Sequence, residues 1–285
     1  MRTELIFLEI ARKDLEAAKS LYDRKLHAHS VFYLQQSIEK AVKSFGMWTK
    51  TLTETDAKDA IGHEAWKAYL KVFNEVRNKI ARLEKASDVL PKLKETSLMK
   101  ELEISKLKDM FDKYEKVFLN KNARRSISFS RKDLQNIATE INKLSKELKE
   151  KLGQRTAIRI SEKETEHLKE KLYEFLNIFS EINPNVMEAK DKLSALITPE
   201  FIGKIFKKLI KPVSELIFCY LSLFYLSLVF SSHAVTTRYP QDSFNPLMAY
   251  SEKMPLIRML DSFIRILEET LQKLNYTYVK MLSGP

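Results

Sequence analysis

The sequence predicts an all-α protein: an antiparallel helical bundle with an inserted helical hairpin of coiled-coil type. Only 5 glycines and 8 prolines interrupt the 285 residues, which leaves too few turns for a many-stranded fold. Between these breakers the chain is rich in Lys, Glu, Leu and Ile, most of which favour helices. Hydrophobic residues make up 44% of the chain, which is enough to form a substantial core.

Three helices are expected near the N-terminus. Apolar residues recur at helical spacing over residues 3–24 and again over residues 27–50. Asp56 or Asp59 could then cap a third helix. Short connections between these helices are typical of antiparallel neighbours, so we assign residues 1–85 to the bundle.

Residues 86–212 are predicted to be a Lys/Glu-rich helical insertion. Apolar residues alternate at spacings of three and four over residues 134–148 and 168–182, a pattern typical of coiled-coil seams that need a facing helix. Gly153 lies between the two seams and suits a helix C-cap. The simplest interpretation of this pattern is an antiparallel helical hairpin.

The bundle is expected to resume over residues 213–285. Pro212 is compatible with the first turn of a long apolar helix, and no residue from 216 to 235 carries a full charge. Such a run is long enough to cross a bilayer, but serines, tyrosines and a histidine interrupt it. We interpret it as the central helix of a bundle rather than a membrane span. A last amphipathic helix is expected from about Pro255 to about Met281.

The charge of the chain favours an anionic partner. The net charge is +11, and residues 86–212 hold 27 basic and 20 acidic side chains, a local excess of +7. The single cysteine, Cys219, lies in the apolar run, so it cannot form an intramolecular disulfide and is not expected to be a catalytic thiolate. The sequence has no Gly-rich phosphate loop or zinc pattern, and its start lacks the unbroken apolar stretch of a signal peptide. These features predict a cytoplasmic protein with no cofactor and no metal.

A short motif in the second expected helix is the most specific feature of the sequence. QQSIEKAVK follows a helix with the pattern DLEAA, and it contains Gln35, Gln36, Glu39, Lys40 and Lys43. His63 then opens the third helix, and the run Arg238-Tyr239-Pro240 ends the apolar helix. In this order, these features resemble the HEPN domain family, over about residues 1–70 and 215–282.

The resemblance implies a helical domain with a nucleotide- or RNA-related role. HEPN domains often accompany a nucleotidyltransferase in toxin–antitoxin or defence systems, and they commonly form homodimers. Many are metal-independent ribonucleases with an arginine and a histidine separated by four to six residues near the last helices. Here no histidine follows Arg238, so we expect a non-catalytic module that binds RNA, a nucleotide or a nucleotidyltransferase partner. The alternatives are a divergent metal-independent ribonuclease toxin and a helical interaction or scaffold protein.

Two groups of residues are candidate binding sites. The first is a polar pocket at one end of the bundle, where an arginine and a histidine could hold a phosphate. Its members are Gln36, Glu39, Lys43, His63, Arg238 and Tyr239. The alternative is that Glu39 and Lys43 form an ion pair on the helix surface, and that His63 caps a helix or forms a hydrogen bond in the core.

The second group is a basic segment, residues 120–132, that contains no acidic residue. Its cations could neutralise several phosphates, and its phenylalanine could contact a base. Its candidate residues are Lys121, Arg124, Arg125, Phe129, Arg131 and Lys132. The alternative is an exposed connection whose basic side chains only face water.

A homodimer is also expected. The helix over residues 216–235 is apolar on every face, and the last helix carries a wide apolar stripe. The stripe contains Leu256, Met259, Leu260, Phe263, Leu267 and Leu271. A symmetric dimer would bury apolar surface that one chain leaves exposed. The alternative is a monomer in which the inserted helices cover this surface.

Overall fold

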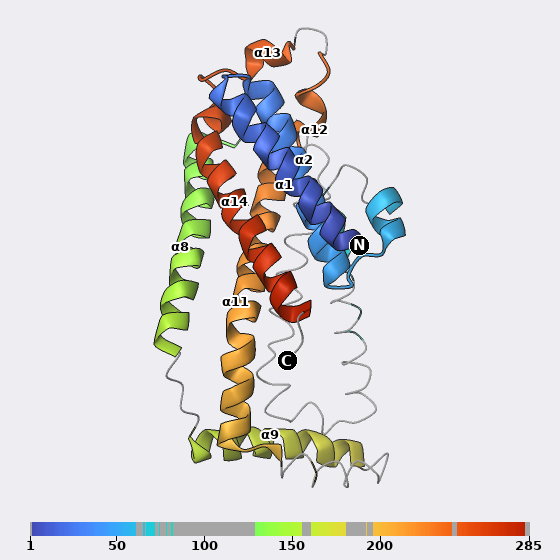
Figure 1. The fold of residues 1–285 in the computed structure, drawn as a ribbon, viewed down its shortest axis with the longest axis vertical. Helices are drawn as coiled ribbons and strands as arrows, with labels where there is room; N and C mark the ends of the chain where they lie inside the picture. The colour runs from blue at the N-terminus through green and yellow to red at the C-terminus, as the bar shows by residue number, and fades with distance from the viewer. Residues whose placement is uncertain are drawn as a thin grey trace. The chain divides into compact units, whose positions relative to one another are not determined.

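The described part of the chain is all-α, as predicted (Figure 1). The computed structural model describes residues 2–60, 65, 67–71, 74, 78, 81, 129–155, 161–180, 192, 196–240 and 244–282, and none of these residues forms a β-strand. The helices are α1 (Thr3–Asp23), α2 (His27–Trp48), the π-helical turn η1 (Asp56–Ala60), α8 (Arg131–Arg155), α9 (Glu162–Ser180), α11 (Pro199–Phe230), α12 (His233–Thr236), α13 (Pro246–Ala249) and α14 (Pro255–Leu282). The predicted site residues His63, Lys121, Arg124 and Arg125 lie outside the described residues.

The chain divides into two compact units. The first unit consists of Met1–Val72, Val117–Glu150 and Pro212–Pro285, and the second of Phe73–Lys116 and Lys151–Lys211. Both ends of the chain therefore belong to the first unit. So does most of α8, which the sequence analysis assigned to the insertion. The boundaries of the predicted insertion stay a prediction.

A ladder of serines joins α1 and α2. The hydroxyls of Ser30, Ser37 and Ser44, spaced by seven residues on α2, each donate a hydrogen bond to a backbone carbonyl of α1. The acceptors, spaced by seven residues in the opposite direction, are Ala18 at 2.8 Å, Ala11 at 2.6 Å and Glu4 at 2.7 Å. Because a seven-residue period returns to the same helix face, small side chains at these positions let the two antiparallel helices approach closely.

The core of the first unit lies between α11 and α14. The thiol of Cys219 lies 3.6 Å from the carbonyl oxygen of Thr270, and the rings of Phe230 and Phe263 meet edge to face at 5.6 Å. Residue numbers rise on one helix as they fall on the other, so the two helices are antiparallel. Burial raises the pKa of the Cys219 thiol. Among the described helices, none is long and apolar enough to cross a membrane.

This core covers most of the apolar run from within the chain. The side chains of α11 that are fully or nearly fully buried include Phe218, Leu223, Leu226, Val229 and Phe230. On α14, Leu256, Leu260, Phe263, Leu267 and Leu271 are buried in the same way. Packing within the chain therefore covers much of this helix, although Ile217 is still 46% exposed. A homodimer stays a prediction that rests on the family resemblance.

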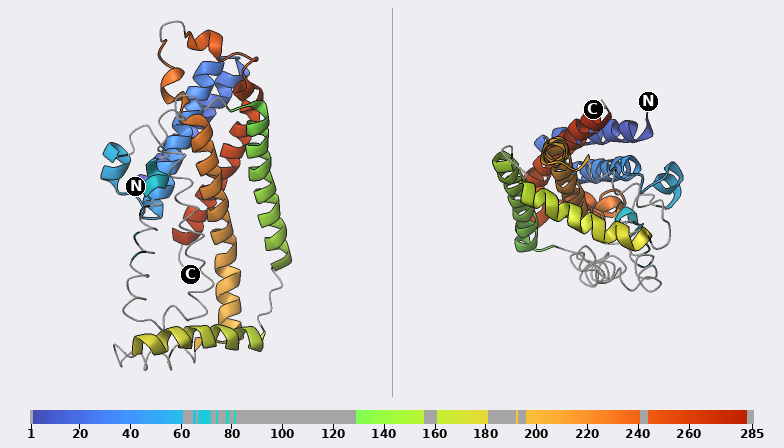
Figure 2. Two further views of the ribbon diagram at one scale, coloured as in Figure 1. Left: turned by 180° about the vertical axis from the view of Figure 1, so that it is seen from behind. Right: turned by 90° about the horizontal axis from the view of Figure 1, so that it is seen from below.

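The predicted seam of α8 packs in the first unit. Leu134, Ala138 and Ile141 are buried, and the Ser145 hydroxyl donates a 2.8 Å hydrogen bond to the Glu269 carboxylate on α14. Figures 1 and 2 show α8 alongside α14. Gly153 lies inside α8 rather than at its end, so the predicted C-cap is wrong. A single glycine costs a helix only about 1 kcal/mol, which the flanking helix-forming residues offset.

The start of α11 also differs from the prediction. This helix begins at Pro199, and Pro212 lies inside it rather than in its first turn. The Thr198 hydroxyl accepts a 3.1 Å hydrogen bond from the Phe201 backbone N–H, which caps the helix at this earlier position. A threonine cap followed by proline is a stronger start signal than Pro212 alone.

Candidate functional site

The motif residues of α2 form one continuous polar chain. We call Gln35, Gln36, Glu39, Lys40 and Lys43 the polar stripe of α2. The amide nitrogen of Gln36 donates to the amide oxygen of Gln35 at 2.6 Å, and the Lys40 ammonium donates to the amide oxygen of Gln36. The Lys43 ammonium donates to the Glu39 carboxylate at 2.9 Å, and the Lys40 nitrogen lies 3.8 Å from the same oxygen. Spacings of three and four residues place these groups on one side of the helix.

Glu39 and Lys43 are buried, so their ion pair is not a surface pair. The side chain of Glu39 is 1% exposed and that of Lys43 is 9% exposed. The alternative of a helix-surface pair is therefore wrong, because neighbouring helices cover both charges. Removing one partner of a buried pair leaves an uncompensated charge, which is strongly destabilising. Replacing Glu39 or Lys43 alone is therefore expected to destabilise the packing around α2.

Asp14 on α1 adds a second carboxylate to this environment. Burial raises its pKa above the ordinary value, the Lys40 ammonium opposes this shift, and the Glu39 carboxylate reinforces it. The electrostatics of the stripe thus extend from α2 to α1. A substitution at Lys40 would change the charge balance of both carboxylates.

Arg238 and Tyr239 lie at the Phe32 end of the same helix. The Arg238 guanidinium carbon is 5.2 Å from the centre of the Phe32 ring and 5.3 Å from the centre of the Tyr239 ring. Its Nε donates a 3.1 Å hydrogen bond to the carbonyl oxygen of Ala234. Phe32 precedes Glu39 by seven residues, which is about 10 Å along α2 and returns to the same face. Arg238 therefore lies at one end of a line of residues that leads to Glu39. The complete pocket stays a prediction, since His63 is not described.

The described part of the basic segment separates its aromatic residue from its cations. Phe129 is half-buried and lines an apolar pocket of about 330 Å³ with Leu134 and Leu256. Arg131 and Lys132 are exposed in the first turn of α8. The predicted aromatic contact beside the charges would require Phe129 to leave this pocket. The two cations remain available to an anion.

A capping box fixes the start of α8. The Ser130 hydroxyl accepts from the Asp133 N–H at 3.2 Å, and the Asp133 carboxylate accepts from the Ser130 N–H at 3.0 Å. Hydrogen bonds from the Ser130 hydroxyl and N–H lower the pKa of Asp133. This capping box fixes the backbone of the helix turn from which Arg131 and Lys132 project.

His233 belongs to a half-buried hydrogen-bond network whose partners were not predicted from the sequence. The Nδ1 of His233 lies 2.6 Å from the Tyr250 hydroxyl, which also lies 2.8 Å from the Thr236 hydroxyl. Burial lowers the pKa of His233 to about 4, so the ring is neutral near pH 7. Tyr250 lies 17 residues after His233 in the sequence, and no helical spacing relates the two positions.

The family comparison covers the helices that carry the polar stripe. Residues 5–89 match the family model of the HEPN domain. The chain carries a HEPN domain. The resemblance predicted from the motif is therefore confirmed. The searches of curated proteins and of solved structures give no match.

The HEPN match includes α1, α2 and η1, and with them the whole polar stripe. Arg238 and α14 lie beyond the matched residues. Their packing against the HEPN region is nevertheless direct: the Lys19 ammonium pairs with the Glu268 carboxylate at 2.8 Å, and the Ser44 hydroxyl lies 3.2 Å from the Tyr278 hydroxyl. Within the described residues, no group of three or more His, Cys, Asp or Glu side chains is placed to hold a metal ion.

Proposed function

We propose that this HEPN-domain protein is a non-catalytic module that binds RNA or a nucleotide. The observation that carries the proposal is the exposure of Arg131 and Lys132 in the first turn of α8. The N-terminus of a helix carries partial positive charge, so two cations there lie in an unfavourable field. A bound phosphate would be attracted by both side chains. The net charge of +11 supports the same class of ligand.

The contacts of the polar groups favour binding over cleavage. Glu39 and Lys43 are held in a buried ion pair, and the Arg238 guanidinium stacks on Phe32. His233 is kept neutral and in contact with the Tyr250 hydroxyl. A general acid or base must reach the reacting atoms of its substrate. Each of these groups instead contacts another side chain of the protein, which supports a module that binds without cleaving.

A protein partner is the second part of the proposal. The family resemblance favours a nucleotidyltransferase partner of toxin–antitoxin or defence type, and a homodimer. Near the end of the first unit where α1 turns into α2, α13 presents Leu247 and Met248, which are 67% and 76% exposed (Figure 1). Exposed apolar side chains of this kind are typical of protein interfaces when they form a continuous patch.

RNA binding by the full chain tests the proposal. Fluorescence polarisation with a single-stranded RNA of about 20 nucleotides, between about 50 and about 200 mM salt, gives the affinity and its salt dependence. We expect the Arg131→Ala/Lys132→Ala variant to bind about tenfold more weakly, with a salt slope smaller by about 1.4, since two phosphate contacts are lost.

The matched control is Lys143→Ala/Lys146→Ala on the same helix. Both lysines are exposed and pair only loosely with Glu147 and Glu150, at 3.9 and 3.8 Å. The control removes the same charge, so an equal loss of affinity would show that only net charge matters. Cleavage of the RNA in the presence of EDTA would contradict the non-catalytic part of the proposal.

A further inference from the structure

The apolar pocket that Phe129 lines is bounded by three segments of the first unit. They are the start of α8, the junction of α11 and α12, and the start of α14, and they contribute Phe129, Ser130, Leu134, Val229, His233, Met254, Pro255 and Leu256. All three segments belong to the first unit, so one compact body forms the pocket. Its volume of about 330 Å³ is within the range of small-molecule sites.

The walls of this pocket are mostly apolar. Leu134, Val229 and Leu256 belong to the core and are buried. Phe129 and Met254 are only partly buried. A methionine side chain is unbranched and fills irregular shapes, so Met254 lets its part of the wall adjust to a ligand. Walls of this kind bind an apolar molecule by removing its surface from water.

One polar side chain of the lining is available to a ligand. The Ser130 hydroxyl is already used, since it donates to the Asp133 carboxylate at 2.6 Å. His233 differs, because only its Nδ1 has a partner, the Tyr250 hydroxyl at 2.6 Å. Its Nε2 is accessible and has no hydrogen-bond partner within the described part of the chain. A single polar atom in an apolar pocket fixes the orientation of a ligand.

The His233 ring is held in place by its neighbours. The rings of Phe230 and Tyr250 meet it edge to face, with centroids at 6.3 and 5.6 Å. The imidazole is neutral near pH 7, because burial lowers the pKa of His233 to about 4. In a neutral imidazole Nε2 either accepts or donates, depending on the tautomer, and a hydroxyl group can do both. A hydroxyl group is therefore complementary to Nε2 in either tautomer.

We propose that this pocket binds a compact apolar molecule that carries one hydroxyl group, such as a small phenol. The hydroxyl group pairs with Nε2 of His233, and the rest of the molecule contacts Leu134, Val229 and Leu256. None of the described lining side chains carries a charge near pH 7, so the pocket favours a neutral ligand over an ionic one. The inference goes beyond the proposed function and does not rest on Arg131 or Lys132.

Titrations of the full chain with 4-ethylphenol and with ethylbenzene, followed by ligand-observed NMR, test the pocket. The two probes differ only in the hydroxyl group. We expect 4-ethylphenol to bind about fivefold more tightly, since it alone forms the hydrogen bond to His233. Equal affinities for the two probes would overturn the proposal, as would the absence of 4-ethylphenol binding at about 2 mM.

His233→Phe tests the contact with the imidazole. It should lower the affinity for 4-ethylphenol to that for ethylbenzene, because phenylalanine has a ring but no ring nitrogen. The matched control is Tyr250→Phe, which removes the hydrogen bond to Nδ1 and keeps the imidazole. This variant should retain the preference for 4-ethylphenol. Loss of the preference in both variants would show that His233 acts only through local packing, which would contradict the proposal.

Met254→Trp keeps the test decisive if His233→Phe does not fold. The larger side chain should fill the pocket from its partly exposed wall and abolish the binding of both probes. Met248→Trp is the control, since Met248 is exposed on α13 and does not line the pocket. The thermal unfolding midpoint shows whether each variant is folded. A folded Met254→Trp protein that still binds 4-ethylphenol, or equal effects of the two tryptophan variants, would place the probes outside this pocket and overturn the proposal.

Discussion

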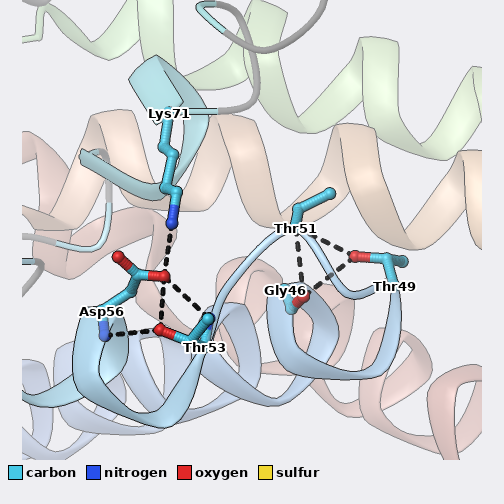
Figure 3. A network of polar contacts seen from close by, with 6 residues as sticks. All are labelled: Gly46, Thr49, Thr51, Thr53, Asp56 and Lys71. Carbon is cyan, nitrogen blue, oxygen red and sulfur yellow. Dashed lines mark hydrogen bonds and ion pairs between the residues drawn. The ribbon is translucent and has the colours of Figure 1, made fainter.

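The two ends of α2 differ in how their backbone groups are capped. At the C-terminal end the chain folds back on the helix: the Thr51 N–H donates to the Gly46 carbonyl at 2.9 Å, and the hydroxyls of Thr49 and Thr51 both donate to the same oxygen at 3.1 Å (Figure 3). At the N-terminal end Leu26 provides no side-chain cap, and the first turn faces an open cleft of about 640 Å³ lined by residues 25–29, Leu247 and residues 250–253. The chain therefore closes one end of this helix with its own backbone and threonine side chains, while no side chain caps the other end.

The contrast does not arise from the turns themselves. Lys25 follows α1 and Lys50 follows α2, and both have a φ of 60°. In each case the next residue donates to a carbonyl five positions back: Leu26 to Leu21, and Thr51 to Gly46. This is a Schellman motif, in which glycine is the usual residue at the left-handed position. The same strained turn therefore precedes the open end and follows the closed end, and only its surroundings differ.

Gly46→Ala should have the largest effect on the closed end. A Cβ atom at Gly46 would lie 2.3 Å from Cδ1 and 2.6 Å from Cγ of Leu52, which is itself buried. Because the Leu52 side chain would have to move, we expect a loss of about 2 kcal/mol in the free energy of unfolding, even though alanine favours helices. Urea unfolding measures this loss.

The control for Gly46→Ala is a double-variant cycle with Leu52→Ala. Truncating Leu52 removes the clash, so the double variant should be no less stable than Leu52→Ala alone. A Gly46→Ala protein as stable as the wild type would show that the end of α2 is not tightly closed.

Asp56→Asn should have an intermediate effect, on the network that follows the closed end. Figure 3 shows Asp56 between Thr53 and Lys71. Its carboxylate accepts from the Lys71 ammonium and from the hydroxyl and N–H of Thr53, and these bonds lower the pKa of Asp56 to about 2. We expect Asn at this position to cost about 1 kcal/mol at pH 7, since it weakens a helix cap and removes a partly exposed ion pair.

The lowered pKa of Asp56 also predicts how the free energy of unfolding changes with pH. A carboxylate whose pKa is lower in the folded state stabilises the protein fully above the unfolded pKa, near 4, and this stabilisation is lost as the pH falls toward about 2. Urea unfolding between about pH 5 and about pH 2.5 should therefore show a steeper loss for the wild type than for Asp56→Asn. Asp133→Asn is the matched control, because Asp133 closes the same kind of capping box with Ser130 and has no lysine hydrogen bond among the causes of its lowered pKa. Equal slopes for wild type and Asp56→Asn would contradict the role of Lys71.

Periodicity predicted the helices of this protein better than it predicted their environment. The helices expected over residues 3–24 and 27–50 match Thr3–Asp23 and His27–Trp48 within two residues, because each carries a strong apolar repeat over many turns. A spacing of four residues between Glu39 and Lys43 is the same on a surface as in a core, so the burial of this pair was not predictable. Burial depends on which helices pack around it.

The cleft could not be predicted for a related reason. Its two walls come from segments around residues 25 and 250. No sequence pattern in either segment indicates that the two segments lie close together. One signal was present in the sequence: Leu26 precedes the second helix where Ser, Thr, Asp or Asn usually stands. By contrast, Thr53, Ser130 and Ser161 each have an acidic residue three positions later, and all three form capping boxes. Arg2 at the start of α1 also supplies no side-chain cap, so an uncapped helix start does not by itself indicate a cleft.

Lys25→Gly and Lys50→Gly should have the smallest effects on stability, and they compare the turns at the two ends of α2. Each substitution relieves a lysine held at a φ of 60°, which glycine adopts without steric cost. Glycine also gives the unfolded chain more freedom, so we expect each variant to gain only about 0.5 kcal/mol in the free energy of unfolding. Both lose one positive charge, but only Lys25 lines the cleft. Urea unfolding should nevertheless show a gain of similar size for both variants, since the two turns have the same backbone geometry and hydrogen bonds. If Lys25→Gly is less stable than the wild type, the lysine side chain contributes more to the fold than its strained backbone costs.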